Sequence, residues 1–144
     1  MKKTTLIVLT VFFFLSCSHD KENVPAPCTT TTAAVAGPYK ITAATYQASS
    51  TSAETDYYNI LFDPCERDDI YTFNAAGTYQ IADAGLACSP SSNDNGTWSL
   101  TGTTGMVIDG DAVSLESFDC KKLILVNTNI QTQGDRLKLT LTRQ

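Results

Sequence analysis

A β-hairpin pattern occupies the middle of the chain: Asp69-Ile70-Tyr71-Thr72-Phe73, then Asn74-Ala75-Ala76-Gly77, then Thr78-Tyr79-Gln80-Ile81. Polar and apolar residues alternate in both arms, as in a half-buried strand, and the connection contains the residues of a turn. Outward from this hairpin, period-two patterns between turn residues predict further strands, so that the full set is 39–46, 69–73, 78–81, 97–100, 105–109, 112–115, 122–128 and 136–143. Eight short strands without a helical period predict an all-β antiparallel barrel or sandwich. Closure is the economical arrangement, because a barrel has no exposed edge.

The N-terminus has the layout of a secretory signal, with Lys2 and Lys3 before an apolar run over residues 6–15. That run is about half of the roughly 20 residues that a membrane-spanning helix needs. The sequence Phe14-Leu15-Ser16-Cys17 resembles a bacterial lipobox, which implies that Cys17 becomes an N-terminus carrying palmitate-type acyl chains. Two or more such chains anchor a protein stably in a membrane. Ser18 follows the cysteine where an aspartate would retain the protein at the inner membrane. We therefore expect the outer membrane, with the protein facing the periplasm or the cell surface.

Composition divides the chain into three segments. Residues 1–16 are the predicted signal peptide, residues 17–36 the lipidated N-terminus and a Pro/Thr-rich tether, and residues 37–144 the barrel domain. Removal of the signal takes away two lysines and leaves eight basic and fifteen acidic residues, a net charge of −7. An acidic chain without clustered Lys or Arg predicts no nucleic-acid partner.

Four cysteines remain once Cys17 is assigned to lipid: Cys28, Cys65, Cys88 and Cys120. In a small exported domain, an even number of cysteines predicts two disulfides, for which three connectivities exist. The positions on either side of the central hairpin favour Cys65–Cys88, which leaves Cys28–Cys120. A zinc site would need Cys-x-x-Cys pairs or nearby histidines, which the sequence lacks.

An ordered set of short motifs resembles the lipocalin-like domain of Gram-negative lipoproteins. The motifs are Cys65-x-x-Asp68-Asp69-x-Tyr71-x-Phe73, Gly77-Thr78-Tyr79, Cys88, Gly96-Thr97-Trp98-Ser99-Leu100 and Arg136-Leu137-Lys138-Leu139-Thr140. The resemblance covers residues 35–143. It implies an eight-stranded up-and-down barrel, a Cys65–Cys88 bridge and no catalytic residues. The family's first strand usually carries Gly-x-Trp, whereas this chain has Gly37-Pro38-Tyr39. Because Pro38 lacks a backbone donor, we expect the barrel floor to close differently.

The sequence contains few of the residues that common catalytic sites require. The only histidine, His19, lies in the predicted tether, and there is no nucleotide-binding glycine motif. We therefore expect neither enzymatic activity nor a cofactor. The acidic segment 63–69 offers Asp63, Glu66, Asp68 and Asp69 as weak candidates for a calcium site. Its spacing matches no calcium loop, and the alternative is that Asp68 and Asp69 cap a turn at the start of a strand.

Aromatic residues are the candidates for ligand contact: Tyr57, Tyr58, Tyr71, Phe73, Tyr79 and Trp98. Tyr57 and Tyr58 could line the barrel mouth or a partner surface, or their segment could plug one end of the barrel. A sole tryptophan on a strand is more often part of a core than a ligand platform.

Two functions follow from these patterns. The first is a non-catalytic barrel, anchored to the outer membrane, that binds a small apolar or amphipathic ligand. The alternative is a filled barrel that serves as an interaction or structural module with an envelope protein partner. Tyr39, Tyr71, Phe73, Tyr79, Trp98 and Phe118 could fill the interior, whereas Ala43, Thr72, Thr97 and Ala112 could leave room.

Overall fold

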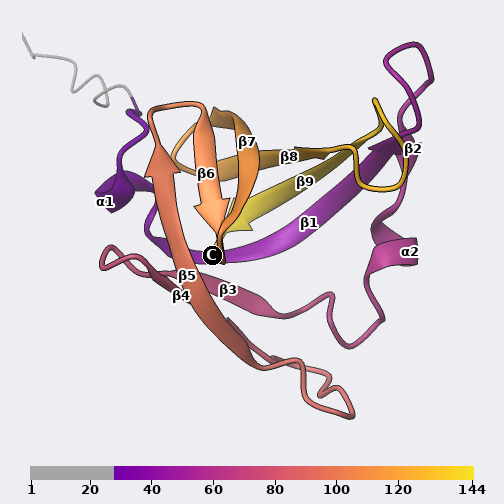
Figure 1. The fold of residues 1–144 in the computed structure, drawn as a ribbon. Helices are drawn as coiled ribbons and strands as arrows, with labels where there is room; N and C mark the ends of the chain where they lie inside the picture. Colours follow the sequence, from indigo (N-terminus) through magenta and orange to yellow (C-terminus); the bar gives the residue numbers. More distant parts are fainter. Residues whose placement is uncertain (1–27) are drawn as a thin grey trace, which may run out of the picture.

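A computed structural model describes residues 28–144, which form a closed antiparallel β-barrel (Figure 1). The elements are α1 (Thr32–Val35), β1 (Gly37–Gln47), β2 (Thr55–Asp56), α2 (Tyr58–Leu61), β3 (Ile70–Phe73), β4 (Thr78–Ala82), β5 (Asp94–Thr101), β6 (Gly105–Ile108), β7 (Asp111–Phe118), β8 (Lys122–Thr128) and β9 (Arg136–Arg143). The predicted signal peptide and Cys17 lie outside the described residues. Within residues 28–144, no helix has the length and apolar character needed to cross a membrane.

The barrel consists of β1 and β3–β9, each antiparallel to its neighbours, and closes through pairing of β1 with β9. The predicted eight-stranded architecture is confirmed, and each predicted strand overlaps one observed strand. The two-residue β2 is an addition that pairs with β1 at Thr45 and Tyr46. Sequence patterns missed β2 and α2, because both are too short to show a period.

β1 closes the barrel because it pairs on both sides. Its first three residues pair with β3, and residues from Tyr39 to Gln47 pair with β9. The register with β9 shifts between Ile41 and Ala43. Such bulges bend a strand and increase its twist, which suits a strand that curves from one side of the barrel to the other.

The two ends of the barrel differ. The closed end carries the connections 74–77, 102–104 and 119–121 together with residues 28–36, and the open end carries the connections 48–69, 83–93, 109–110 and 129–135. In Figure 1, α1 lies on the left and α2 and β2 lie on the right. The buried core is concentrated toward the closed end and includes Val35, Tyr39, Phe73, Trp98, Met106, Leu115, Leu123 and Leu141.

Tyr39 and Arg143 form the floor of the closed end. The Tyr39 side chain is fully buried, and its hydroxyl donates to the carbonyl oxygen of Val35 at 2.7 Å. The Arg143 guanidinium lies 5.1 Å from the centre of the Tyr39 ring and donates to the Tyr39 hydroxyl at 2.6 Å and to the carbonyl oxygen of Ala34. Tyr39 thus stands at the position where the resemblance to lipocalin-like domains predicts a tryptophan. Pro38 pairs with Thr72 without interrupting the barrel.

The predicted tether extends too far into the domain. Residues 32–35 form α1, with Thr31 as its N-cap, and Val35 is fully buried in the core. Composition suggested a poorly packing segment through residue 36. The segment packs because Val35 is buried in the core and its carbonyl oxygen accepts hydrogen bonds from Tyr39 and Arg143. These contacts are enough to dock a Thr/Ala-rich turn on the barrel floor.

Both predicted disulfides form. Cys28–Cys120 ties the start of the described chain to the β7–β8 turn at the closed end, and Cys65–Cys88 joins the two long connections 48–69 and 83–93 at the open end. Chain-entropy estimates for loops of these lengths give about 3–5 kcal/mol per bridge. Residues 28–144 therefore contain a complete barrel with its own core and both bridges.

We predict that replacement of Arg143 by methionine lowers the free energy of unfolding by roughly 2 kcal/mol, because the Tyr39 hydroxyl and the Ala34 carbonyl oxygen both lose the guanidinium that donates to them. Urea unfolding followed by Trp98 fluorescence measures the change. The matched control is Arg136→Met on the same strand, whose ion pair with Glu116 spans 3.9 Å between half-exposed side chains. That variant should cost less than about 1 kcal/mol. Equal losses in the two variants would contradict the role given to Arg143.

Candidate functional site

The open half of the barrel interior contains two adjoining apolar cavities of about 120 Å³ each. They share three wall residues, Ile108 on β6, Leu125 on β8 and Leu139 on β9. The first cavity is further lined by Ile41, Tyr71, Phe73, Tyr79, Ile81 and Leu141. The second is completed by Val113, Asn127 and Leu137. Together they form a small apolar space between the packed core and the open end of the barrel, with few polar groups in its wall.

The Tyr79 ring on β4 lies over Gly96 on the inner surface of the neighbouring strand β5. The register places Tyr79 opposite Gly96, and a Cβ at position 96 would lie 2.7 Å from Cε1 of the Tyr79 ring and 2.1 Å from Oδ1 of Asp109. Any side chain at this position would displace both groups. Gly96 therefore lets the tyrosine ring and the aspartate carboxylate meet at the cavity wall.

Asp109 holds the Tyr79 hydroxyl. The hydroxyl donates to Oδ2 of Asp109 at 2.5 Å, and the Thr97 amide donates to Oδ1 at 2.8 Å. Asp109 adopts a φ of 51°, in the left-handed region, at the β6–β7 turn. The hydrogen bond to Asp109, followed by burial, raises the pKa of Tyr79 to about 12. The same hydrogen bond and the Thr97 amide lower the pKa of Asp109.

Tyr71 gives the first cavity a polar group. Its side chain lines the cavity, and within residues 28–144 its hydroxyl has no hydrogen-bond partner. Burial, reinforced by the negative charges of Asp69 and Glu66, raises the pKa of Tyr71 to about 12. Its hydroxyl therefore stays neutral across the physiological range and can donate or accept one hydrogen bond with a bound molecule.

Tyr57 and Tyr58 do not line either cavity. The Tyr58 hydroxyl lies 3.0 Å from the carbonyl oxygen of Ile41 and 3.2 Å from that of Arg67, and its ring packs beside Phe62 with centroids 5.5 Å apart. Tyr57 packs against Tyr46, with ring centroids 5.0 Å apart. This arrangement corresponds to the predicted alternative in which the segment covers part of one barrel end.

Trp98 belongs to the packed core. It is 3% exposed, and its indole Nε1 donates to the carbonyl oxygens of Asn74 at 2.9 Å and Thr78 at 3.1 Å. Its ring meets Phe73 edge-on, with centroids 5.3 Å apart. Because Phe73 lines the first cavity, Trp98 lies one residue behind the cavity wall.

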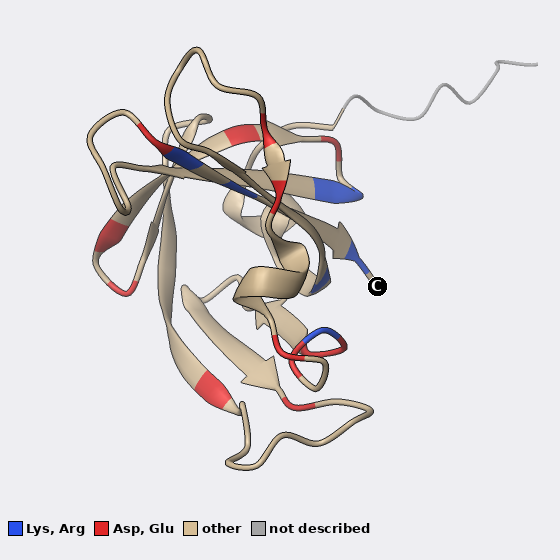
Figure 2. Cartoon of the chain, turned by 90° about the vertical axis from the view of Figure 1, so that its right-hand side faces the viewer, with Lys and Arg blue, Asp and Glu red and all other residues tan. Residues whose placement is uncertain are grey.

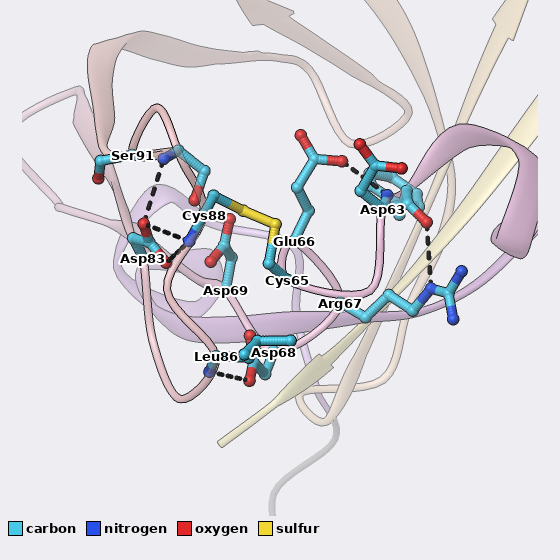
Figure 3. Close-up of a disulfide and its surroundings, with 12 residues drawn as sticks. Asp63, Cys65, Glu66, Arg67, Asp68, Asp69, Asp83, Leu86, Cys88 and Ser91 are labelled. Carbon is cyan, nitrogen blue, oxygen red and sulfur yellow. Dashed lines mark hydrogen bonds between the residues drawn. A yellow bond between two sulfur atoms is a disulfide. The ribbon is translucent and has the colours of Figure 1, made fainter.

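The acidic segment 63–69 fastens two loops together (Figure 3). Oδ2 of Asp68 accepts from the Leu86 amide at 2.8 Å, Oδ1 of the buried Asp69 accepts from the Ala84 amide at 3.3 Å, and Glu66 accepts from the Asp63 amide at 2.8 Å. Among residues 28–144, no group of three or more His, Cys, Asp or Glu is placed to hold a metal ion. The structure therefore does not bring the four calcium candidates together. Asp68 and Asp69, which the sequence offered as caps of a turn at the start of a strand, instead accept backbone amides of the connection 83–93.

The β8–β9 connection beside the mouth is held by a buried aspartate. The Asp135 carboxylate accepts from the amides of Ile130 at 2.7 Å, Gln131 at 2.8 Å and Thr132 at 2.8 Å, and from the Tyr46 hydroxyl at 2.9 Å. Burial alone would raise the pKa of Asp135, but these hydrogen bonds outweigh it and lower the pKa to about 2. The loop is therefore built around one ionised group at neutral pH.

Of the six aromatic residues that the sequence offered as ligand contacts, the structure places three at the cavity, Tyr71, Phe73 and Tyr79. Sequence patterns missed the aliphatic residues of the cavity wall. The alternation of Leu137, Leu139 and Leu141 indicated one apolar face on β9. This alternation could not show that the apolar face of β9 borders empty space toward the open end of the barrel. Asp109 was also missed, since the sequence showed it only as the last residue of the predicted strand 105–109.

Comparison with known proteins agrees with this geometry. A family model described as a lipocalin-like domain matches residues 35–139, so the chain belongs to the family of lipocalin-like domains. No curated protein matches the chain. No solved structure matches it either.

We predict that Asp109→Asn moves the pKa of Tyr79 from about 12 back toward 10, because the amide no longer opposes the phenolate charge. In the native protein, the raised pKa of Tyr79 stabilises the fold fully below pH 10, and this stabilisation is lost as the pH rises toward 12. The variant should therefore unfold at a lower alkaline pH. Ultraviolet absorbance titration of the tyrosines measures the shift, with Tyr71→Phe as the control that removes the other strongly shifted tyrosine.

Proposed function

We propose that this protein is a non-catalytic lipocalin-like binding protein that holds a small apolar or amphipathic molecule in the open half of its barrel. The observation that carries the proposal is the pair of adjoining apolar cavities, one of which has Tyr71 in its wall, with a hydroxyl that makes no hydrogen bond to another described residue. Apolar pockets with a few placed polar groups are the usual form of small-molecule sites.

Cavity size limits the ligand. Each cavity measures about 120 Å³, whereas an engineered cavity of about 150 Å³ in another protein accommodates benzene. Pockets for drug-sized molecules measure about 300–1,000 Å³. A compact ligand would fill one cavity, and a short alkyl chain could run through both past Ile108, Leu125 and Leu139 with its polar end at the mouth.

A second candidate function is an interaction module that binds an envelope protein through the open-end loops. Large apolar side chains are exposed there, with Ile60 at 67% and Leu86 at 59%. Exposed apolar residues at one end of a small domain favour a protein contact. The packed core at the closed end of the barrel is compatible with this function as well.

The cellular setting is also part of the proposal. Acylation of Cys17 would anchor the protein in the outer membrane through a chain that enters the domain at Cys28. Because the Cys28–Cys120 bridge fixes this entry at the closed end, the mouth would lie at the end opposite the attachment point. The eleven residue steps from Cys17 to Cys28 reach at most about 40 Å.

We predict that Ile108→Phe abolishes ligand binding while it preserves or raises the unfolding midpoint, because the larger ring fills empty space shared by both cavities. Residues 18–144, purified from an oxidising compartment without detergent, should show a small-molecule adduct in native mass spectrometry, and the variant should not. Val107→Phe, on the opposite face of the same strand, is the control that should keep the adduct.

Two results would favour the filled interaction module instead. A wild-type protein that stays bare after incubation with fatty acids, sterols and haem-like compounds would argue against the binding function. Destabilisation of the Ile108→Phe variant by about 1–3 kcal/mol would show that the position is already well packed.

We further predict that the full-length wild-type protein partitions into the detergent phase of a Triton X-114 extraction, and that Cys17→Ser shifts it toward the aqueous phase by removing the acylation site. Intact mass measurement should find the mass of the attached acyl chains on wild type alone. A wild-type protein without added lipid mass would refute the anchor.

A further inference from the structure

The strand register places carboxylates on the inner rim of the barrel mouth. Directly paired residues on antiparallel strands point to the same face of a sheet. Asp94 pairs with Ile81 and Asp111 pairs with Ile108, and both isoleucines line the cavity. Asp94 and Asp111 therefore share the inward face with the cavity wall, and both are exposed to solvent at the mouth.

Asp109 adds a third carboxylate at the same rim. Its carboxylate contacts the hydroxyl of the cavity-lining Tyr79, and it is the first residue of the β6–β7 turn, directly after Ile108. Of the ion pairs formed within residues 28–144, none involves Asp94, Asp109 or Asp111. Their charges are therefore not neutralised by a neighbouring cation of the described chain.

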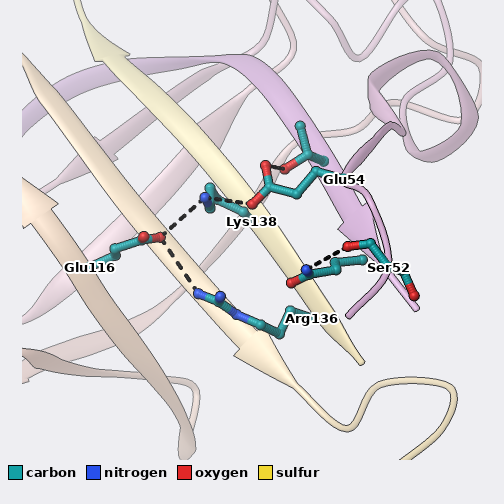
Figure 4. Close-up of polar contacts among 7 residues, drawn as sticks. Ser52, Glu54, Glu116, Arg136 and Lys138 are labelled. Carbon is teal, nitrogen blue, oxygen red and sulfur yellow. Dashed lines mark hydrogen bonds and ion pairs between the residues drawn. The ribbon is translucent and has the colours of Figure 1, made fainter. Parts of the chain in front are cut away.

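The nearby cations are on the outer face of the barrel. Arg136 and Lys138 alternate along β9 with Leu137 and Leu139, which line the cavities, so the basic side chains point away from them. Lys138 pairs with Glu54 at 2.8 Å and with Glu116 at 3.6 Å, and Arg136 lies 3.9 Å from Glu116 (Figure 4). Alternation along β9 therefore separates the two signs of charge across the barrel wall.

The open-end connections reinforce this charge distribution. They contain nine acidic residues and one basic residue, Arg67. Arg67 donates to the carbonyl oxygen of Phe62 at 3.1 Å and lies 6.0 Å from the centre of the Tyr58 ring. Figure 2, viewed from the side on which α2 lies, shows the acidic segments distributed around this end.

We infer that the ligand of this barrel is an amphiphile with a cationic head group, such as an amine or a quaternary ammonium. The inference rests on the proposed binding function and specifies its ligand class. The alkyl part occupies the apolar cavities, and the head lies at the rim near Asp94, Asp109 and Asp111. The ring of Tyr79, whose hydroxyl contacts Asp109 at the rim, suits a cation that has lost part of its hydration. An anionic head would meet uncompensated negative charge.

The test compares three probes with the same alkyl chain: octyltrimethylammonium, octyl sulfate and octanol. Each is titrated below its micelle concentration into residues 18–144, with Trp98 fluorescence and calorimetry as readouts. We expect the cation to bind about tenfold or more tightly than the sulfate at about 20 mM salt, and this ratio to shrink at about 200 mM as the rim charges are screened.

A double variant, Asp94→Asn with Asp111→Asn, should bring the cation-to-anion ratio close to one and leave octanol binding unchanged. The matched control is Glu116→Gln, which removes a carboxylate from the outer face of β7 and should keep the ratio. Equal or tighter binding of the sulfate by wild type would overturn the charge preference while the binding function stands. Failure of all three probes to bind would overturn the proposed function itself.

Discussion

Strand β1 makes hydrogen-bonded pairs with β9 along most of its length and with β3 at its first three residues, and the barrel is closed by this double pairing. Without it, the sheet would have two edges with unpaired backbone groups and an apolar face open to water. The Tyr39–Arg143 contact lies where these pairings meet, since Tyr39 pairs with Tyr71 on β3 and with Arg143 on β9. The floor and the closure are thus one feature of the structure.

The two ends of the barrel are built by different means. The closed end has short turns, a bridge to the incoming chain and a core of aromatic and aliphatic side chains. The open end has long connections held by side-chain carboxylates: Asp68 and Asp69 hold the loop at 83–93, and Asp135 holds the loop at 129–135. Because hydrogen bonds between carboxylates and backbone amides replace apolar packing there, the interior behind these loops can stay partly empty.

Sequence patterns were most successful where the relevant signal is local. The alternation in 69–81 and 136–143 located strands, and the number of cysteines limited the bridges to three arrangements. The same patterns overestimated the tether, because the burial of Val35 depends on Arg143, which is 108 residues away. They also favoured aromatic residues as ligand contacts. The cavity is bordered as much by Ile108, Leu125 and Leu139, which the sequence does not distinguish from ordinary core residues.

The sequence by itself determined the class of fold, the family, the number of bridges and the excess of acid over base. Each of these follows from composition, from period-two alternation or from short motifs, which need no knowledge of distant contacts. Only the tertiary structure decided which residues border empty space and which face each charge occupies. That decision depends on register, because a shift of one residue would move Asp94 and Asp111 to the outer face and Arg136 and Lys138 to the inner one. Register is set by pairing across the whole barrel, so no local stretch of sequence contains it.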